Sequence, residues 1–383
     1  RCAEILEPVL EQDLRRLIYP GGVDAEVGRL SLDEAVIAQP ATFAIQYALA
    51  QLWLSWGVRP AAVAGHSLGE FAAACVAGIF SLEDALLLVA ERGRLMQGLG
   101  GGGMLAVMAE VDALEPLLDE HTSVAAINAP TQVVASGPAA SIDGLEQRLA
   151  EAGIEAQRLP IGLAAHSEMM EPLMEPLGAR VAAMRLGRLA IPMVSTATGE
   201  WVDDDVISDP AYWGRHARVT VRFAEAVGRL LERPDLALLE VGPGQTLAAL
   251  VRRHPAAAPD RPVLASLPHA RQTVDDRVFA LRTLGGLWTA GVDLAHDASP
   301  QGRRRVPLPT YPFDREAFWI DGAPPDTSPR AQEVAVTAVP VGPVAAPMME
   351  VEPVEATADA VAPTETSRAE RIAARLAEII SDL

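Results

Sequence analysis

The chain contains 383 residues, 50% of them hydrophobic, which is enough to bury a large core and leaves room for two or three domains. Acidic residues outnumber basic ones by 51 to 31, and the net charge of -20 argues against nucleic acid or an anionic membrane as a partner, because clustered cationic side chains bind both. The basic residues are all arginine, which excludes catalysis through a lysine Schiff base.

Signals for membranes, disulfides and metals are also missing from the sequence. The most apolar stretch, residues 44–58, is interrupted by polar side chains, and residues 1–6 do not resemble a signal peptide. Cys2 and Cys75 are too few and too far apart for a disulfide framework or a zinc site, and the seven histidines show no metal-ligand spacing. We therefore expect a cytoplasmic protein without a bound metal.

The first predicted elements surround a glycine turn. Helical periodicity runs through residues 31–56, and a short apolar strand is predicted over 61–64. A second helix is predicted over 68–76, and a third begins at Ser81, which forms a capping-box variant with Asp84. The order helix, strand, turn, helix suits a buried strand of a parallel sheet.

The turn between this strand and the second helix reads Gly65-His66-Ser67-Leu68-Gly69. In a G-x-S-x-G turn the serine is exposed at the top of the sheet, with backbone N–H groups of the next helix beneath it. Those groups and the helix dipole can stabilise an oxyanion. The pattern predicts a nucleophile at Ser67, and the alternative is a glycine turn that serves packing alone.

The character of the chain changes beyond Gly100–Gly103, a glycine run that we interpret as a flexible joint. Four strands and two helices are predicted next, over 104–108, 111–118, 124–128, 133–136, 142–152 and 154–159. The alternation resembles a split β-α-β unit of ferredoxin type. We therefore expect residues 104–160 to form an inserted ferredoxin-like subdomain.

The α/β order resumes after the predicted insertion. Helices and strands are predicted over 169–184, 193–195, 221–231 and 236–241, and a further helix follows Gly242-Pro243-Gly244. The expected fold class is α/β. A parallel-sheet core of the α/β-hydrolase type would be built from residues 1–103 and 161–284.

Three segments follow the predicted core. Residues 285–320 are expected to form a linker, and residues 321–366, rich in proline, alanine and acidic side chains without periodicity, a disordered linker. Residues 367–383 begin with a capping box, Ser367 and Glu370, and carry an apolar stripe that requires a partner. We expect this segment to be the first helix of a further domain.

Glu70 extends the turn to Gly-His-Ser-Leu-Gly-Glu, which is much rarer than the five-residue pattern. On this motif and six further stretches, the chain resembles the malonyl or methylmalonyl acyltransferase domain of modular type I polyketide synthases. That domain is a relative of the malonyl transacylases of fatty-acid synthesis. The resemblance covers about residues 1 to 320. The further stretches are Glu91–Gln97, Asn128–Pro130, Ala165–Ser167, Asp209–Trp213, Glu240–Gly244 and Leu308–Phe313.

This resemblance implies roles for Ser67 and His166 as nucleophile and base. In the family the serine attacks the thioester of an acyl-coenzyme A such as malonyl-CoA, and the acyl group then passes to the phosphopantetheine thiol of an acyl carrier protein. The domain itself binds no cofactor. Residues 285–320 would be the post-acyltransferase linker, which packs on a neighbouring ketosynthase domain, and residues 367–383 would open a carrier protein, with a docking helix as the alternative.

His66 is an alternative base, but a side chain next to the nucleophile on a tight turn usually points away from it, and a base needs hydrogen-bond reach. The other histidines are interpreted as surface or satisfied structural residues: His121, His216, His254, His269 and His296.

Arg92 matches the family's arginine that pairs with the free carboxylate of malonyl, a role that suits the planar fork of a guanidinium. An ordinary helix-surface arginine is the alternative, although its helical neighbours offer no acidic partner. Asn128 and His66 are also assigned to substrate binding by the resemblance.

Leu68 and the segment before His166 bear on the extender unit. The backbone N–H of Leu68 matches an oxyanion donor, and its side chain resembles malonyl-type domains, since methylmalonyl-type domains usually carry glutamine there. The sequence before the catalytic histidine, Leu163-Ala164-Ala165-His166, departs from both common patterns, His-Ala-Phe-His and Tyr-Ala-Ser-His. Ala165 stands where the malonyl-type pattern has phenylalanine, so less side-chain volume is present to exclude an α-methyl group. One methyl group changes binding in a pocket by only about 1–3 kcal/mol. We expect malonyl, with methylmalonyl as the alternative.

The family's domain begins with a strand and a glycine-rich turn whose glutamine supplies another oxyanion donor, and this chain starts after that point. Loss of one such donor typically slows the reaction by about 100- to 1000-fold, so we expect upstream residues to restore transfer. Two other functions stay open. A serine hydrolase would share the turn but need an acidic triad member, and a non-catalytic scaffold segment would only space synthase domains.

Overall fold

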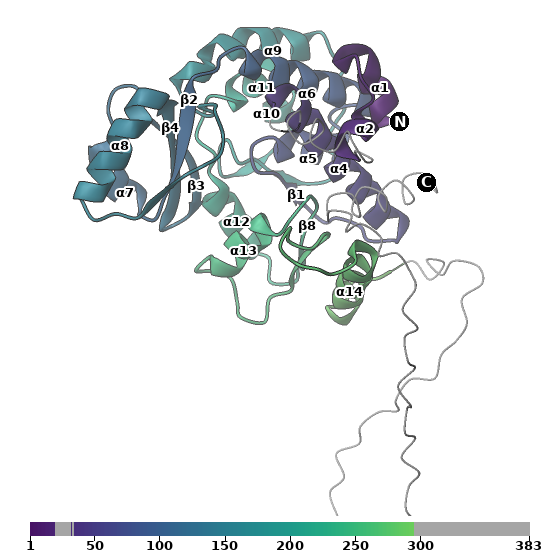
Figure 1. Cartoon of the computed structure of the whole chain (residues 1–383). Coiled ribbons are helices and arrows are strands. Elements are labelled where there is room, and N and C mark those ends of the chain that lie inside the picture. The colour runs from purple at the N-terminus through teal and green to yellow at the C-terminus, as the bar shows by residue number, and fades with distance from the viewer. Residues whose placement is uncertain (20–31, 33, 295–383) are drawn as a thin grey trace, which may run out of the picture. The chain divides into compact units, whose positions relative to one another are not determined.

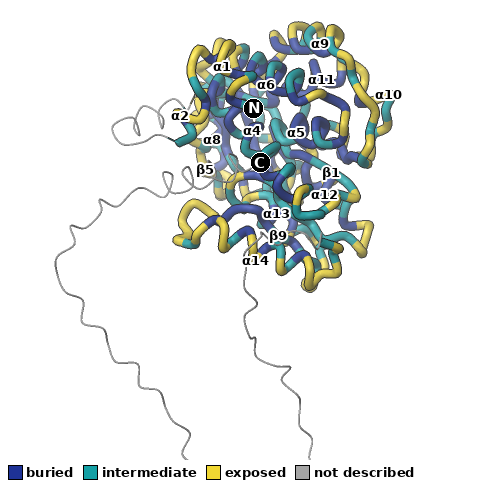
Figure 2. The backbone as a smooth tube through the Cα atoms, turned by 90° about the vertical axis from the view of Figure 1, so that its right-hand side faces the viewer, coloured by how far each residue is buried: buried dark blue, intermediate teal, exposed yellow. Residues whose placement is uncertain are grey.

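Five helices from the first third of the chain pack around one apolar cluster. The computed structural model describes residues 1–19, 32 and 34–294. The five helices are α1 (Cys2–Leu10), α2 (Leu14–Ile18), α4 (Ala35–Ser55), α5 (Gly69–Val76) and α6 (Leu82–Gln97). Figure 2 shows α4 and α5 almost entirely as buried or intermediate residues, and the side chains of Phe43, Phe71 and Leu86 form part of their common core.

The ends of these helices follow the local signals in the sequence. Ser81 caps α6, where its Oγ accepts a hydrogen bond from the Asp84 N–H at 3.0 Å. The chain leaves α4 through Gly57, whose φ of 84° lies in the left-handed region that favours glycine. The predicted start of α6 and the predicted end of α4 are both confirmed.

Parallel strands occur in two short sheets. In the first, β1 (Val63–Ala64) pairs in parallel with β6 (Met193–Val194), and β7 (Trp201–Val202) pairs antiparallel with β6. In the second, β8 (Leu238–Glu240) pairs in parallel with β9 (Val263–Ala265). The strands predicted near residues 61–64, 193–195 and 236–241 are confirmed as β1, β6 and β8.

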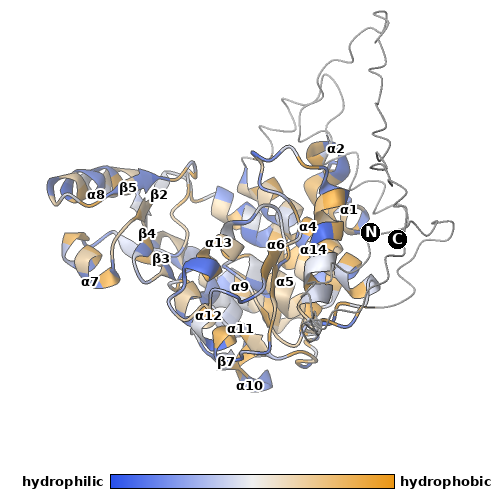
Figure 3. Cartoon of the chain, turned by 90° about the horizontal axis from the view of Figure 1, so that it is seen from below, coloured by the Kyte–Doolittle hydropathy of each residue, from blue (hydrophilic) through white to orange (hydrophobic). Residues whose placement is uncertain are grey.

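A separate four-stranded sheet occupies the segment predicted as an insertion. Its strands are β2 (Gly102–Val107), β3 (Ser123–Ala129), β4 (Gln132–Pro138) and β5 (Ala156–Arg158), in the antiparallel order β3-β4-β2-β5. The helices α7 (Val111–Leu114) and α8 (Ala139–Glu151), with a 3-10 helix at Glu115–Leu117, lie together on one side of the sheet (Figures 1 and 3). Leu105 and Val107 pack toward these helices, and Met104 joins the core on the opposite side.

The structure corrects the interpretation of Gly100–Gly103 as a flexible joint. Gly102 and Gly103 belong to β2, where they pair with Pro138 and Gly137. A side chain at position 102 would overlap the backbone N of Ala164. The close approach of these two segments therefore requires glycine at this point of the strand.

The remaining elements complete the described part of the chain. They are a 3-10 helix at Glu168–Leu173, α9 (Met174–Ala182), α10 (Asp204–Ile207), α11 (Pro210–His216), α12 (Phe223–Leu231), α13 (Thr246–Arg253) and α14 (Asp276–Thr289). Figure 1 shows α12 and α13 below the four-stranded sheet, and their side chains share a core with it. In the part of the chain that is described, no helix combines the length and hydrophobicity needed to cross a bilayer.

Several predicted segments fall at or beyond the edge of the described residues. The predicted boundary between residues 284 and 285 lies inside α14, so this helix runs across it. Most of the predicted linker 285–320, the linker 321–366 and the helix 367–383 lie outside the described residues, as does His296. The domain boundaries therefore stay predictions.

Candidate active site

The turn between β1 and α5 holds Ser67 in an unusual backbone conformation. Its φ is 49°, in the left-handed region that few residues other than glycine adopt. A side chain at position 65 would overlap the backbone of Gly69, so only glycine permits a turn this tight. The tight turn holds Ser67 in this strained conformation, as the G-x-S-x-G pattern predicts.

The structure brings Ser67 and His166 together across 99 positions of sequence. Ser67 Oγ lies 2.7 Å from His166 Nε2, and His166 Nδ1 lies 2.7 Å from the carbonyl oxygen of Val219. A carbonyl can only accept, so Nδ1 carries the ring hydrogen and Nε2 is left as an acceptor for the serine O–H. This arrangement can remove the proton from the Ser67 hydroxyl.

The surroundings of His166 favour its neutral form. Its side chain is almost fully buried, and burial, the Arg92 charge and His216 together hold its pKa well below the usual 6.5. The backbone N–H of His166 donates to Ala217 O at 3.0 Å, which fixes the segment as well as the ring. At neutral pH the imidazole is therefore free to accept a proton.

Arg92 extends from α6 toward the same hydroxyl. Its Nη2 lies 3.5 Å from Ser67 Oγ, its Nη1 donates to Gln39 Oε1 at 2.5 Å, and its guanidinium stands 5.8 Å from the centre of the Phe71 ring. Arg92 is only 2% exposed, and its Nε has no partner among the described residues. Burial lowers the pKa of Arg92 to about 10.

This buried cation has no carboxylate partner in the part of the chain that the structure describes. Leaving a buried charge without a counter-ion is costly, so such a group usually has a ligand or a structural partner. The neutral side chain of Gln39 does not supply the missing charge. The site can therefore bind an anion next to Ser67.

His66 points to a different partner from the one a base would need. Its Nε2 lies 2.7 Å from Asn128 Oδ1 on β3, and its ring packs 5.3 Å from that of Phe223. Burial lowers its pKa. The two predicted substrate-binding residues, His66 and Asn128, thus contact each other. Their contact joins the turn to the four-stranded sheet.

Leu68 is the N-cap residue of α5, so its backbone N–H lies just before the first residue of the helix, Gly69. The next amides, those of Gly69, Glu70 and Phe71, donate to His66 O, Ser67 O and Leu68 O. The Leu68 N–H lies outside this series, as an oxyanion donor must.

The predicted specificity residues lie beside the base. Leu163 and Ala165 are partly buried and Ala164 is 1% exposed, all in the segment that leads to His166. Ser136 Oγ donates to Ala165 O at 2.7 Å, and Ser167 Oγ donates to Ala164 O at 2.7 Å. These bonds fix the backbone of the segment.

The contacts among the polar side chains behind the site have no signal in the sequence. Glu70 is fully buried and accepts hydrogen bonds from Thr196 and Tyr212, and it lies 3.4 Å from His216 Nε2. Burial alone would raise the pKa of Glu70, but the His216 charge and these bonds lower it overall. His216, expected to be a surface or satisfied structural residue, is a buried residue whose Nε2 faces Glu70, but its Nδ1 has no partner among the described residues.

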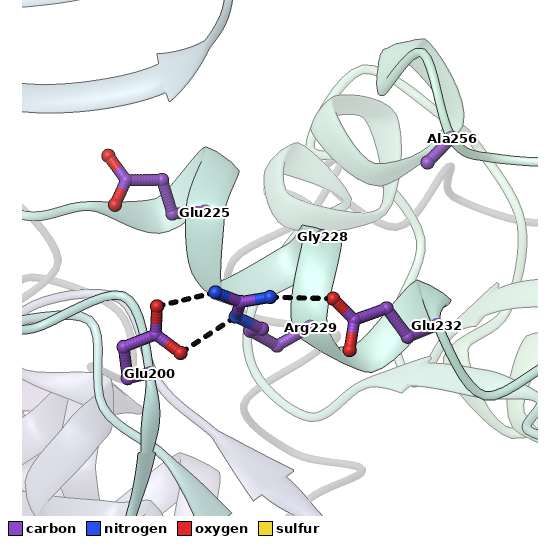
Figure 4. A pocket seen from close by; sticks show the side chains of 6 residues that line it. All are labelled: Glu200, Glu225, Gly228, Arg229, Glu232 and Ala256. Atoms are coloured by element: carbon purple, nitrogen blue, oxygen red, sulfur yellow. Dashed lines mark hydrogen bonds and ion pairs between the residues drawn. The ribbon is translucent and has the colours of Figure 1, made fainter.

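A surface hollow of about 350 Å³ lies elsewhere on the structure (Figure 4). It is lined by Glu200, Glu225, Gly228, Arg229, Glu232 and Ala256. Arg229 is already paired there, with Glu200 at 2.6 and 2.7 Å and with Glu232 at 2.7 Å. This hollow shares no lining residue with the Ser67 site and offers a ligand no free cation.

Comparisons with known proteins give a consistent result. Residues 5–294 match the family model for the acyl transferase domain. The chain is 39% identical over 349 residues to the polyketide synthase GfsA of Streptomyces halstedii, covering 90% of the chain and 4% of GfsA. It is 38% identical over 292 residues to the mycoketide-CoA synthase of Mycobacterium tuberculosis, covering 76% of the chain and 7% of that synthase. The chain thus spans only a small part of the length of these relatives.

Comparison with solved structures also identifies acyltransferase domains as similar to this chain. The acyl transferase domain of SpnD, in complex with 2-(pent-4-yn-1-yl)malonyl, is 36% identical with a TM-score of 0.70, over 76% of this chain and 69% of that one. The acyltransferase domain from the second module of the salinomycin polyketide synthase is 38% identical with a TM-score of 0.69, over 81% and 72%. FabD from Acinetobacter baumannii is 26% identical with a TM-score of 0.65, over 76% and 90%.

Proposed function

The chain belongs to the acyl transferase domain family, and from this premise we propose that it loads an extender unit, malonyl, from coenzyme A onto an acyl carrier protein. Acyl-CoA and the phosphopantetheinyl carrier protein are then substrates, and the domain itself holds no cofactor. A neighbouring ketosynthase domain and a cytoplasmic location complete this proposal.

The proposed reaction has two halves. In the first, the Ser67 hydroxyl proton passes to His166 Nε2 while Oγ bonds to the thioester carbon, and the C–S bond then breaks as the proton moves to the coenzyme A sulfur. In the second, His166 takes the proton of the carrier thiol, whose sulfur bonds to the acyl carbon. The Ser67 oxygen leaves and recovers its proton, and the Leu68 N–H donates to the oxyanion in both halves.

The observation that supports a carboxylated substrate is the environment of Arg92. Its guanidinium is buried, lies 3.5 Å from Ser67 Oγ and has an unpaired Nε among the described residues. A free acyl carboxylate would supply the missing negative charge through two parallel hydrogen bonds. A serine hydrolase of esterase type would have no use for a cation at this place.

The choice of malonyl rests on Leu68 and is weakened by Ala165. Leu68 is partly buried where the acyl chain would begin, and leucine there is typical of malonyl-type domains. Ala165 is a small side chain next to the base, which favours methylmalonyl as the second candidate. An α-methyl group changes binding by only about 1–3 kcal/mol, so one position can reverse the preference.

We further propose that the core, residues 1–103 and 161–284, is an α/β-hydrolase-like sheet into which the ferredoxin-like subdomain 104–160 is inserted. The order β3-β4-β2-β5 with two helices on one side supports the second assignment. The described strands β1 and β8 each have only one parallel neighbour, and Gln46 lies beside the turns that follow both. We propose that a further strand pairs here and that the turn after it supplies a second oxyanion donor, so a chain extended by this strand should transfer about 100- to 1000-fold faster.

The test is transfer itself. The protein is incubated with malonyl-CoA or methylmalonyl-CoA and a phosphopantetheinyl carrier protein, and acyl-carrier formation and free acid are measured separately. We expect acyl-carrier to form faster from malonyl-CoA. Rapid release of free acid without transfer would instead support a hydrolase, and no reaction from a protein that includes the upstream strand would support a scaffold. A faster reaction with methylmalonyl-CoA would change the extender assignment alone.

A further inference from the structure

The carboxylate of Glu70 is buried in the first turn of α5, three residues after Ser67. It is 0% exposed, and a buried carboxylate needs several hydrogen bonds to be tolerated. Its Oε2 accepts from the Thr196 N–H at 2.8 Å and from Thr196 Oγ1 at 2.5 Å, and its Oε1 accepts from the Tyr212 hydroxyl. His216 Nε2 lies 3.4 Å from Oε2.

These partners come from two segments that are distant in sequence from the Ser67 turn. Thr196 follows β6, and its Oγ1 also lies 2.8 Å from the carbonyl oxygen of Gly65, at the start of the turn. Tyr212 and His216 lie on α11. One carboxylate therefore joins the turn, the end of β6 and α11.

The segment after α11 holds the base. Ala217 O, one residue beyond His216, accepts the backbone N–H of His166 at 3.0 Å, and Val219 O faces His166 Nδ1 at 2.7 Å. The contacts thus form a closed path from Glu70 through His216 and this segment to His166, and from His166 Nε2 back to Ser67 Oγ at 2.7 Å. The two histidine rings also meet edge to face at 6.4 Å.

The ring of His216 depends on Glu70 for its only polar contact among the described residues. Its Nδ1 has no partner, and Phe71 and Trp213 supply aromatic packing at 5.1 and 5.9 Å between ring centres. Packing of this kind leaves the ring free to turn, whereas the buried Glu70 carboxylate, 3.4 Å from Nε2, favours one orientation of the ring. Loss of the carboxylate would therefore release the ring that precedes Ala217 and Val219.

We propose that Glu70 is a positioning residue for the Ser67–His166 pair, acting through His216 on the backbone carbonyls that orient His166. The inference rests on the proposed function in that it concerns the same pair. It adds that the negative charge of Glu70, and not its size alone, fixes the geometry of proton transfer. A misplacement of about 1 Å can cost roughly 100-fold in rate, so a small movement of this segment is sufficient.

The kinetic test compares Glu70→Gln with Glu146→Gln, which changes an exposed carboxylate on α8 that is ion-paired with Arg158. We expect Glu70→Gln to lower kcat for acyl transfer about 30- to 100-fold with KM for acyl-CoA changed by less than about threefold, because positioning of the pair is lost and substrate contacts are not. The control should keep the kcat of the unaltered chain.

A double variant tests the path itself. If Glu70 acts through His216, the variant with both Glu70→Gln and His216→Gln should have a kcat within about threefold of the lower single variant, since the two residues work as a unit. Multiplication of the two effects would overturn the path. If Glu70→Gln fails to fold, Thr196→Val and His216→Gln carry the test, with the same expected loss in kcat and retained KM.

A spectroscopic readout separates this inference from the proposed function. In the protein labelled with ¹⁵N-histidine, the His166 signal, assigned through its loss in His166→Gln, should show a single tautomer with hydrogen on Nδ1. We expect Glu70→Gln to average or broaden this signal and Glu146→Gln to preserve it. An unchanged His166 signal, or a kcat within about threefold of the unaltered chain, would overturn the role of Glu70. A changed signal in a chain that never transfers acyl groups would instead overturn the proposed function.

Discussion

Two buried charged side chains flank Ser67, and they differ in how completely they are paired. Glu70 is surrounded by Thr196, Tyr212 and His216, which together occupy both of its oxygens. Arg92 has the neutral oxygen of Gln39 and a long contact to Ser67 Oγ, and its Nε has no partner among the described residues. The contrast separates a charge that holds the protein together from one that is ready to bind a ligand.

The difference follows from the cost of burying charge. A buried ion whose partners are all present contributes to one folded geometry, and removing it leaves those partners unsatisfied. A buried ion that lacks its counter-ion is instead a cost to the free protein, which the binding of an opposite charge offsets. Substitutions at the two positions should therefore have different effects on stability, although both should lower activity.

The largest effect is expected on the stability of the protein when Glu70 is substituted. Glu70→Ala should lower the free energy of unfolding by about 3–5 kcal/mol, because it removes a buried carboxylate and leaves Thr196, Tyr212 and His216 without their partner. Urea unfolding followed by circular dichroism measures this loss. Arg92→Leu is the matched comparison and should leave the free energy of unfolding unchanged or raise it. Equal losses in both variants would break the contrast.

The second-largest effect is expected on the choice between acyl substrates when Arg92 is substituted. Arg92→Leu should slow transfer of malonyl by about 100-fold, or about 2.7 kcal/mol, because the carboxylate loses its charge-assisted hydrogen bonds. Transfer of acetyl, which has no free carboxylate, should not fall with it. Arg94→Leu, at an exposed arginine on the same helix, is the control. An equal loss for malonyl and acetyl would mean that Arg92 supports the fold or the base and not the carboxylate.

A smaller effect is expected at Ala165, where the contrast concerns shape and not charge. Ala165→Phe should reduce transfer of methylmalonyl relative to malonyl by about 10- to 100-fold, because the larger ring would occupy the space of an α-methyl group. Competition between the two acyl-CoA substrates measures this ratio in one experiment. A ratio that does not change would show that the segment 163–165 does not contact the α-carbon.

The smallest effect concerns pH. His166 must be neutral to accept a proton, and its pKa lies well below 6.5 because of burial, the Arg92 charge and His216. The rate of acyl-enzyme formation should therefore stay constant as pH falls to 6.5 and decrease only at lower pH, where His166 becomes protonated. In Arg92→Leu one repelling charge is gone, so the pKa of His166 rises and the decrease should begin at higher pH. A shift to lower pH would contradict this arrangement.

Local signals in the sequence were sufficient for the turn and for most of the elements around it. The Gly65–Gly69 pattern fixes a strained turn because glycine alone fits at position 65, and the Ser81 cap fixes the start of α6. Short pieces such as β7 and α10 were not predicted, since two to four residues carry no periodicity. The interpretation of Gly100–Gly103 as a flexible joint was wrong because a glycine run can also allow two backbones to approach closely, as Gly102 does.

The site was predictable only where a motif or the family resemblance marked it. Ser67, His166 and Arg92 were identified this way, and the structure brings their side chains together. Glu70 was seen as part of a rare motif, but its burial and its partners Thr196 and His216 depend on contacts between distant segments. Gln39, which binds Arg92, lies in a helix without any local signal. Partners of this kind follow from tertiary packing and cannot be read from spacing.

The most direct test of the central claim is the intact mass of the chain after incubation with malonyl-CoA or acetyl-CoA. We expect one malonyl adduct in the unaltered chain, none in Ser67→Ala, and in Arg92→Leu a malonyl adduct that forms no faster than the acetyl adduct. A malonyl adduct that persists in Ser67→Ala, or an Arg92→Leu chain that still prefers malonyl over acetyl, would contradict the assignment of Ser67 as nucleophile or of Arg92 as the carboxylate-binding residue.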